Sequence, residues 1–474
     1  MRKSEFMLGE SFSATGRWWL PENPDVKVYG TLNYSRTKIE LVLSGEFETV
    51  PLEKLMIVGE KKFKDRPCIH GLANDREKFT LLQSSCSLSG QTTNYAVRFV
   101  IVGEQTTDAE NIKIASMSLY CSHLDSFLVC NVLGFTNDGE RESLKSVTIE
   151  YKHPEKLRYR INPINAAVDF QVEPLLSIQR MKHAIEARAL IHLTPDTPQN
   201  VFYYLSAVWK ICYLLTLLTD ERVSPTGMII LLESDKYVKS FLCAESSFAS
   251  PPDENSGPLF LFHFGHIAEQ FQGAIDRWFS VPDTLLEAIQ LTMDAHRNEY
   301  HSIQGRFLML AQAVEVTSRT LSSSKYMSEE DFKEVTKTLA EAIPRSVSSD
   351  HRQSLAQRIS FLYEYSFKKR IVTLLNELLP ETVGIICMNT KEFAAGVADT
   401  RNYFTHYTDD LRKVTLKDSD LFWASEKLLL LLRIIFIKHL GIDEKLIVDQ
   451  IKDHHRLMQR IVIARRHKEC VKTS

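Results

Sequence analysis

The sequence predicts an α+β protein in which an N-terminal β-rich, antiparallel, sandwich-like region precedes an all-α helical bundle. Two observations predict this order. Short runs rich in β-branched and aromatic residues fill the first part of the chain, and several of them alternate as half-buried strands do. After about Pro282 glycine and proline become rare, and apolar residues recur with the period of about 3.6 that amphipathic helices show.

The length and the charge limit the organisation and the partners. A chain of 474 residues exceeds one compact core, so two or three domains are expected. We place a β-rich domain at residues 1–275, divisible into 1–165 and 166–275, and a helical domain at 282–474. The net charge of −3 excludes general binding of polyanions, so any nucleic-acid site must be a local patch.

Four runs in the first part of the chain predict strands, at residues 26–32, 38–43, 94–103 and 146–152. In the second run the apolar residues alternate and fall on one face: Ile39, Leu41 and Leu43. The third run alternates in the same way, at Tyr95, Val97, Phe99 and Ile101. Turn-forming residues separate these runs, and the pattern predicts a sandwich or an open barrel.

The middle of the chain is mixed. A strong helix is predicted at residues 200–219 and a strand near 227–234, whereas 250–258 has the composition of a loop. The two most apolar runs of the chain each contain a basic residue, Lys210 and Arg433. These runs fit buried helices better than membrane spans, so no membrane partner is expected.

The last part of the sequence predicts a series of helices. Phe307, Leu310 and Val314 lie along one stripe, and Ser328 with Asp331 resembles a capping box at the start of another helix. Further helices are predicted at residues 352–379, 391–407, 418–440 and 443–467. Together these predict a helical bundle.

The eight cysteines are scattered, and no signal-like segment opens the chain, which indicates reduced thiols and a cytoplasmic protein. Cys68 and His70, like Cys121 and His123, stand two residues apart, a spacing that puts both side chains on one face of a strand. Two such pairs meeting across a sheet would supply four zinc ligands. No C-x-x-C accompanies them and cysteine is commonly buried, so we expect no metal and no cofactor.

Arg401 and His406 form an R-x4-H pattern. The pattern alone is weak, because three similar pairs occur elsewhere: Arg345 with His351, Arg433 with His439, and Arg460 with His467. Here, however, Thr390 can cap a helix on which Asn402 and His406 share a face. Arg401 lies about 140° away around that helix, but its long side chain can reach the same surface.

Such a set suits RNA cleavage without a metal. A histidine with a pKa near neutrality can move the proton of the ribose 2′-hydroxyl, and a fixed guanidinium can neutralise the charge that grows on the phosphoryl oxygens. The simpler interpretation is a charged helix face with a surface histidine. Spacing and chemistry alone favour the simpler interpretation.

The stretch "DTRNYFTHY" (399–407) resembles the R-x4-H motif of HEPN domains, specifically the ApeA-type HEPN domain of bacterial anti-phage defence proteins. Upstream, "FLMLAQAVEVTSR" (307–319) is similar to an earlier core helix of that family, with its Gln-x-x-Glu at Gln312 and Glu315. The segment "SFSATGRWWLPENPDVKVYGTLNYS" (11–35) resembles the start of the ApeA N-terminal domain, which includes a G-x-W-W-L-P-like run.

This resemblance implies a homodimeric endoribonuclease in which two R-x4-H helices form one RNA-cleaving cleft at a twofold, isologous contact. Arg401 and His406 would be catalytic, and Asn402 would support them. The N-terminal half would sense a phage-derived trigger or restrain the nuclease. Because some HEPN domains only mediate contacts, a non-catalytic scaffold for dimerisation or for RNA or protein binding is the alternative.

The C-terminal end is rich in basic residues. Lys452, Arg456 and Arg460 recur every four residues, and Arg465 and Arg466 follow. On one helix this spacing makes a stripe that suits the RNA backbone. A solvated last helix with cations near its C-terminus is the other interpretation, and both stay open.

Overall fold

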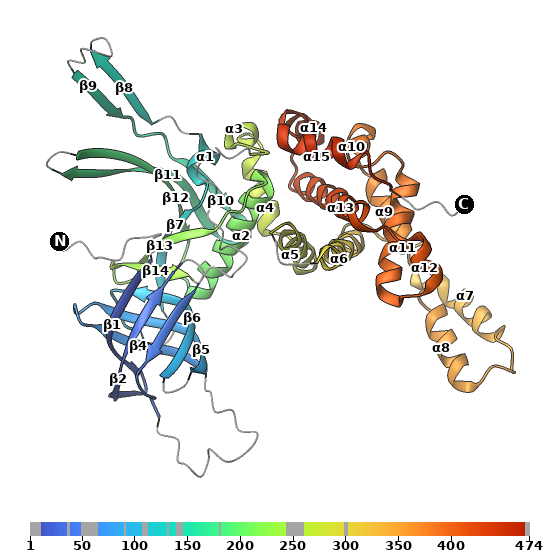
Figure 1. Cartoon of the computed structure of the whole chain (residues 1–474), viewed down its shortest axis with the longest axis horizontal. Helices are drawn as coiled ribbons and strands as arrows, with labels where there is room; N and C mark the ends of the chain where they lie inside the picture. The colour runs from blue at the N-terminus through green and yellow to red at the C-terminus, as the bar shows by residue number, and fades with distance from the viewer. Residues whose placement is uncertain are drawn as a thin grey trace. The chain divides into compact units, whose positions relative to one another are not determined.

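The computed structural model describes residues 11–35, 38–48, 65–89, 92–106, 112–129, 132–138, 146–179, 182–242, 260–297 and 302–469. The chain divides into two compact units, Met1–Ser280 and Val281–Ser474. The first unit is β-rich and antiparallel and the second is helical, which confirms the predicted α+β class (Figure 1). The loop predicted at 250–258 lies outside the described residues.

Antiparallel pairing closes the first strands into a barrel. Strand β1 pairs with both β2 and β4, β3 joins β2 to β6, and β5 joins β6 to β4. The sequence predicted a sandwich or an open barrel, whereas the pairing closes these strands into a ring, and closure removes the free edges of the barrel. The barrel strands are β1 (Phe12–Leu20), β2 (Asn23–Tyr34), β3 (Ile39–Leu43), β4 (Arg66–Ala73), β5 (Lys78–Ser89) and β6 (Thr92–Val102).

The same sheet continues beyond the barrel from the end of β6, which also pairs with β14. From there the strand order runs β14, β13, β7, β12, β11, β10. A division of the chain at residue 165 would cut this sheet, because β7 and β10 precede that position. The strands are β7 (Ile114–Cys121), β10 (Leu157–Ile161), β11 (Ala166–Gln179), β12 (Lys182–Pro195), β13 (Pro225–Leu232) and β14 (Tyr237–Leu242), with a separate hairpin of β8 (Leu133–Asp138) and β9 (Ser146–Tyr151).

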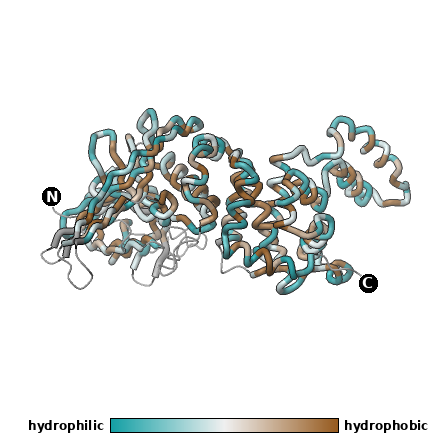
Figure 2. The backbone as a smooth tube through the Cα atoms, turned by 90° about the horizontal axis from the view of Figure 1, so that it is seen from above, coloured by the Kyte–Doolittle hydropathy of each residue, from teal (hydrophilic) through white to brown (hydrophobic). Residues whose placement is uncertain are grey.

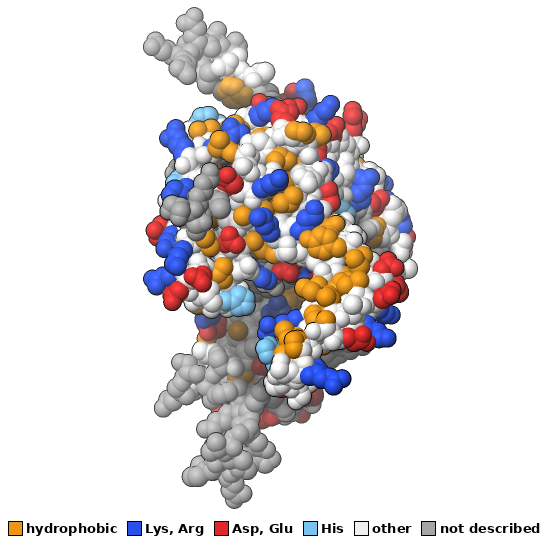
Figure 3. Space-filling model, turned by 90° about the vertical axis from the view of Figure 1, so that its right-hand side faces the viewer, with side chains coloured by type: hydrophobic (Ala, Val, Ile, Leu, Met, Phe, Trp, Pro, Cys, Tyr) orange, Lys and Arg blue, Asp and Glu red, His pale blue; other side chains and the backbone are white. Residues whose placement is uncertain are grey.

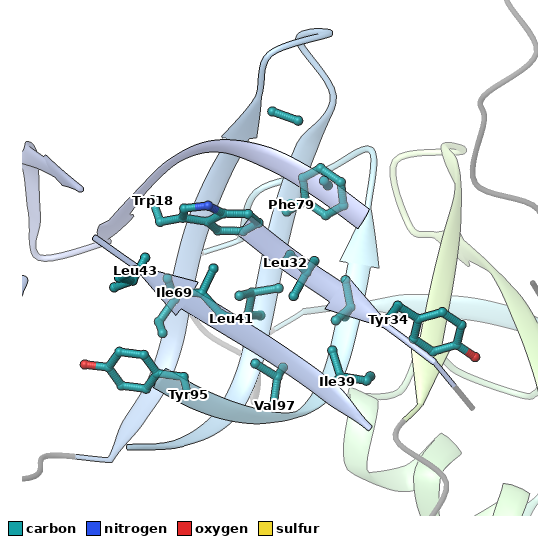
Figure 4. Packing of buried hydrophobic residues seen from close by; sticks show 14 of the residues in the cluster. Trp18, Leu32, Tyr34, Ile39, Leu41, Leu43, Ile69, Phe79, Tyr95 and Val97 are labelled. Atoms are coloured by element: carbon teal, nitrogen blue, oxygen red, sulfur yellow. The ribbon is translucent and has the colours of Figure 1, made fainter. Parts of the chain in front are cut away.

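The barrel interior confirms the alternation predicted for β3, whose three apolar residues are buried (Figure 4): Ile39, Leu41 and Leu43. In β6 the prediction holds only for the first half. Tyr95 and Val97 join the barrel core, but further along Val100 and Val102 join it in place of the predicted Phe99 and Ile101. At the end of β6 all four consecutive residues from Phe99 to Val102 are buried, so both faces of the strand are covered and the simple alternation no longer marks the core side.

The α-helices of the first unit, among its described residues, are α1 (Leu124–Leu128), α2 (Val201–Thr219), α3 (Phe264–Ile267) and α4 (Phe271–Phe279). Helix α2 is the predicted one, and the side chain of Asn200 caps it by accepting the backbone N–H of Tyr203. By length and composition α2 could cross a membrane, but 61% of its apolar window is buried inside the unit. It is therefore placed as a core helix, as predicted.

The second unit consists of helices throughout its described residues, and Figure 2 shows apolar residues gathering in its interior. The long apolar helix α13 packs on α5 and α6, while α7 and α8 pair with each other. The helices are α5 (Asp283–Arg297), α6 (Ile303–Leu321), α7 (Glu329–Glu341), α8 (Ser349–Ile359), α9 (Phe367–Asn376), α10 (Pro380–Ile386), α11 (Thr390–His406), α12 (Asp409–Val414), α13 (Asp418–His439), α14 (Glu444–Asp453) and α15 (His455–Ala464).

Two of the predicted helices are each split in two. The run 352–379 contains α8 and α9, which begins only after the side chain of Ser366 caps it. The run 443–467 contains α14 and α15, because His454 leaves the helical conformation and caps α15 through its ring nitrogen. In both cases the next helix begins after a residue whose side chain caps it.

Candidate functional site

Helix α11 carries the predicted site, and its start is firmly anchored. Asn389 is the N-cap rather than the predicted Thr390, because the Asn389 side chain accepts two backbone N–H groups of the first turn. The N–H groups of Met388 and Asn389 both donate to the Glu469 carboxylate at 3.0 Å. Glu469 also pairs with the buried Lys427 at 2.6 Å. The last described residue of the chain therefore holds the first turn of α11.

The other end of α11 exposes the predicted histidine. His406 is the last helical residue and its side chain is exposed. Tyr407 ends the helix with a left-handed backbone, φ 52°. The Tyr407 hydroxyl accepts a hydrogen bond from Gln304 of α6 at 2.6 Å. The imidazole therefore stands at a defined helix end and is open to solvent.

Arg401 lies at the contact of α11 with α6 and α9. Its Nη2 donates to Glu315 at 3.1 Å, and its Nη1 lies 3.4 Å from the Asn402 side-chain oxygen. The guanidinium sits 5.5 Å from the ring centroid of Phe367 on α9. The Arg401 side chain is still 35% exposed. It is thus held by its neighbours while part of it faces solvent.

The carboxylate that holds Arg401 belongs to a longer series of ion pairs. Glu315 also pairs with Arg319 at 3.3 Å, Arg319 pairs with Glu364 at 2.6 Å, and Glu364 pairs with Arg370 at 2.9 Å. Arg370 is buried, and this burial, with the nearby Arg319, lowers the pKa of its guanidinium. We call Arg401–Glu315–Arg319–Glu364–Arg370 the arginine relay. It carries one more positive than negative charge.

The structure brings two of the three predicted site residues into contact. Arg401 and Asn402 are neighbours through the long hydrogen bond, whereas His406 makes no hydrogen bond to either within the described residues. All three occupy the end of α11, on the partly or fully exposed surface. One chain therefore presents a cation, an amide and an imidazole on one surface.

The other three Arg/His pairs of the sequence lie outside α11 and have different surroundings. Arg433 is buried in α13. Arg460 pairs with Glu426, and His467 contacts Asp420 at 3.0 Å, so both side chains of that pair take part in internal contacts. Arg345 and His351 are exposed on either side of the cap of α8.

The comparisons with known proteins agree with this architecture. A family model described as ApeA N-terminal domain 1 matches residues 13–278, and one described as Apea-like HEPN matches residues 308–446. The chain belongs to the ApeA family. Its helical unit contains a HEPN domain, a type that commonly acts as a ribonuclease in defence proteins. No curated protein and no solved structure matches the chain.

The match to the Apea-like HEPN model ends at residue 446, before all five of the predicted basic C-terminal residues. The break at His454 puts Lys452 on α14 and Arg456 and Arg460 on α15, so the predicted stripe along a single helix is wrong. Several of these cations have internal partners: Lys452 pairs with Glu381, Arg460 with Glu426, and Arg465 donates to the Gly384 carbonyl at 2.7 Å. Arg466 is exposed.

The surface of the ApeA-family chain shows no single-sign field on the face in Figure 3, where basic and acidic side chains intermingle around apolar ones. RNA binding by the basic C-terminal residues stays a prediction. A local contact by the exposed Arg456 and Arg466 is compatible with this arrangement.

The ApeA N-terminal domain does not bring the two Cys/His pairs together. Cys68 and His70 lie on β4 and both contact the Thr106 carbonyl, His70 at 2.7 Å. Cys121 ends β7, which is not a neighbour of β4, and its thiol lies 3.9 Å from that of Cys212. Among the described residues no group of three or more His, Cys, Asp or Glu is placed to hold a metal ion.

Sequence reasoning missed most of the arginine relay around this HEPN motif. The spacing of Glu315 and Arg319 is a signal that could have indicated an ion pair on one helix, since residues four apart are neighbours. Glu364 and Arg370 carry no such signal. Their pairing with α6 depends on how the segment before α9 folds back, and sequence spacing does not report this.

Proposed function

We propose that this ApeA-family chain is a cytoplasmic endoribonuclease of anti-phage abortive infection that cleaves RNA without a metal. Arg401, Asn402 and His406 would form its site. The observation that carries the proposal is their shared position at the end of α11 inside the HEPN domain, with Arg401 held but partly open and His406 exposed.

The chemistry needs only the RNA and these side chains. A ribose 2′-hydroxyl attacks the adjacent phosphorus, its proton passes to an imidazole, and the bond from phosphorus to the 5′-oxygen breaks. A protonated imidazole supplies the proton that the leaving 5′-oxygen takes up. The products are a 2′,3′-cyclic phosphate and a 5′-hydroxyl. The Arg401 guanidinium would neutralise the charge on the phosphoryl oxygens as the new bond forms.

One copy of the site has a single histidine, whereas the reaction uses a base and an acid. Two copies related by a twofold axis would combine two imidazoles and two guanidinium groups in one cleft. We therefore propose a homodimer through the HEPN helices. The N-terminal domain would respond to a phage-derived trigger and control this nuclease.

The test is cleavage of total RNA by the purified chain in the presence of EDTA. The variants Arg401→Ala and His406→Ala should each lose about 100-fold or more of the rate, because each removes one part of the transition-state machinery. Sequencing of the ends should find 2′,3′-cyclic phosphates. Inhibition by EDTA would point to a metal-dependent reaction instead.

The exposed pair Arg345 and His351 supplies the matched control, since it has similar spacing outside α11. The double variant Arg345→Ala/His351→Ala should cleave RNA like the wild type. RNA profiles identical for wild type, Arg401→Ala and His406→Ala would favour the scaffold alternative. If the purified chain needs an activator, phage challenge of cells that carry each variant tests the same residues with that activator present.

A further inference from the structure

We propose that Glu315 is a positioning residue for Arg401, and that the rest of the arginine relay fixes Glu315 in turn. The inference rests on the proposed function, since it explains how the guanidinium of that site is held ready for a phosphate. It concerns a residue of α6, away from the R-x4-H motif on α11.

The first step is the geometry at Arg401. Nη2 of Arg401 donates a hydrogen bond to Oε2 of Glu315 at 3.1 Å, and the ring of Phe367 lies against the same guanidinium. A guanidinium has five N–H donors, so the Glu315 contact leaves others free to reach a phosphoryl oxygen. These two contacts hold the Arg401 side chain, which has four rotatable bonds, in one orientation although its position is partly exposed.

The second step is the charge. A carboxylate that paired with Arg401 alone would cancel its charge and weaken its attraction for phosphate. Glu315, however, is shared between Arg401 and Arg319, through one oxygen each. Glu364 is likewise shared between Arg319 and Arg370, both of which contact its Oε2. The relay therefore keeps a net positive charge while its carboxylates hold the arginines in place.

The third step is the anchor. Arg370 is 1% exposed, and its Nη1 has no hydrogen-bond partner within the described residues. A buried cation with incomplete hydrogen bonding needs its remaining carboxylate, so Glu364 cannot easily leave it. This end of the relay is fixed in the core. Because Arg319 pairs with both Glu364 and Glu315, the fixed Glu364 also restricts the position of Glu315.

The experiment uses the full chain with Glu315→Gln, which keeps the shape of the side chain and removes its charge. We expect the rate of RNA cleavage at saturating RNA to fall about 10- to 100-fold with KM changed little, because a displaced guanidinium affects the reacting phosphate most. Glu315→Asp, which restores the charge, should recover part of the rate. Glu334→Gln, at an exposed carboxylate of α7, is the matched control.

A second readout does not depend on cleavage. In a chain labelled with ¹⁵N-arginine, Arg401→Lys identifies the Arg401 Nε–H signal, and Glu315→Gln should shift or broaden it. A wild type that fails to cut RNA would overturn the proposed function, while this signal would still decide whether Glu315 holds Arg401. An unchanged signal, or a cleavage rate equal to or above that of the wild type, would overturn the positioning role.

The relay itself is tested at Arg319. Glu364→Gln would leave the buried Arg370 without its carboxylate and would risk unfolding, so Arg319→Gln is the better variant. The Arg319 side chain is 47% exposed, and its loss leaves the core intact. It should move the Arg401 signal and the rate in the same direction as Glu315→Gln, but less. No effect on either would limit the positioning role to Glu315 alone.

Discussion

At the scale of single residues, the barrel depends on a glycine where a strand passes a tryptophan. Trp18 of β1 and Gly71 of β4 are opposite each other in the register, and Trp18 is fully buried. A Cβ at position 71 would lie 2.2 Å from the Trp18 ring. The indole N–H donates to the Gly30 carbonyl at 3.0 Å, so the ring cannot turn away without losing that bond. Only glycine fits opposite this ring.

We expect Gly71→Ala to destabilise the N-terminal unit by about 1–3 kcal/mol, the usual cost of overpacking a well-packed core. Urea unfolding followed by tryptophan fluorescence measures it, since Trp18 reports on this barrel. Gly134→Ala is the control, because a Cβ there meets its nearest atoms at an ordinary 3.8 Å. Equal midpoints for the two variants would show that the strands separate without cost.

At the scale of elements, the sequence predicted those features that local patterns control. The alternation of β3 and the apolar character of α2 follow from side chains within one element, and both predictions are confirmed. Closure of the barrel and the pairing of β6 with both β5 and β14 depend on strands far apart in the chain. No local pattern reports such pairings, so these were missed.

The site shows the same division. The R-x4-H spacing and the helix around it were readable from the sequence because they belong to one helix, α11. The Asn389 cap was missed by one residue, since Asn389 and Thr390 are both good caps. The contact of Arg401 with Glu315 joins residues that are 86 positions apart, and only the packing of α11 against α6 creates it.

The anchoring of α11 gives a prediction at this scale. Glu469→Gln should destabilise the helical unit by about 3–5 kcal/mol, because it leaves the buried Lys427 without its carboxylate. Thermal or urea unfolding followed by circular dichroism measures the loss. Adding Lys427→Met should restore most of the stability, since both charges are then gone. A Glu469→Gln chain as stable as the wild type would show that Lys427 finds water or another partner.

At the scale of the whole molecule, the proposed reaction needs more than one chain supplies. The net charge of −3 and the intermingled surface charges provide little long-range attraction for RNA. Binding must then come from a local concentration of guanidinium groups. Two copies of α11 meeting at a twofold axis would double the Arg401 charge and pair an imidazole acid with an imidazole base at the same place.

This proposal predicts that a defective chain inhibits a normal one. Light scattering of the purified wild type should give twice the chain mass of 54.4 kDa. When wild type and an excess of Arg401→Ala/His406→Ala carry different tags and are co-expressed, the mixed dimers should cleave RNA about 100-fold more slowly than the wild type, because one acid–base group is missing from the cleft. Mixed dimers with Arg345→Ala/His351→Ala should be fully active. Mixed dimers of the first kind with half the normal activity, or a monomeric mass, would show that each chain cleaves RNA alone.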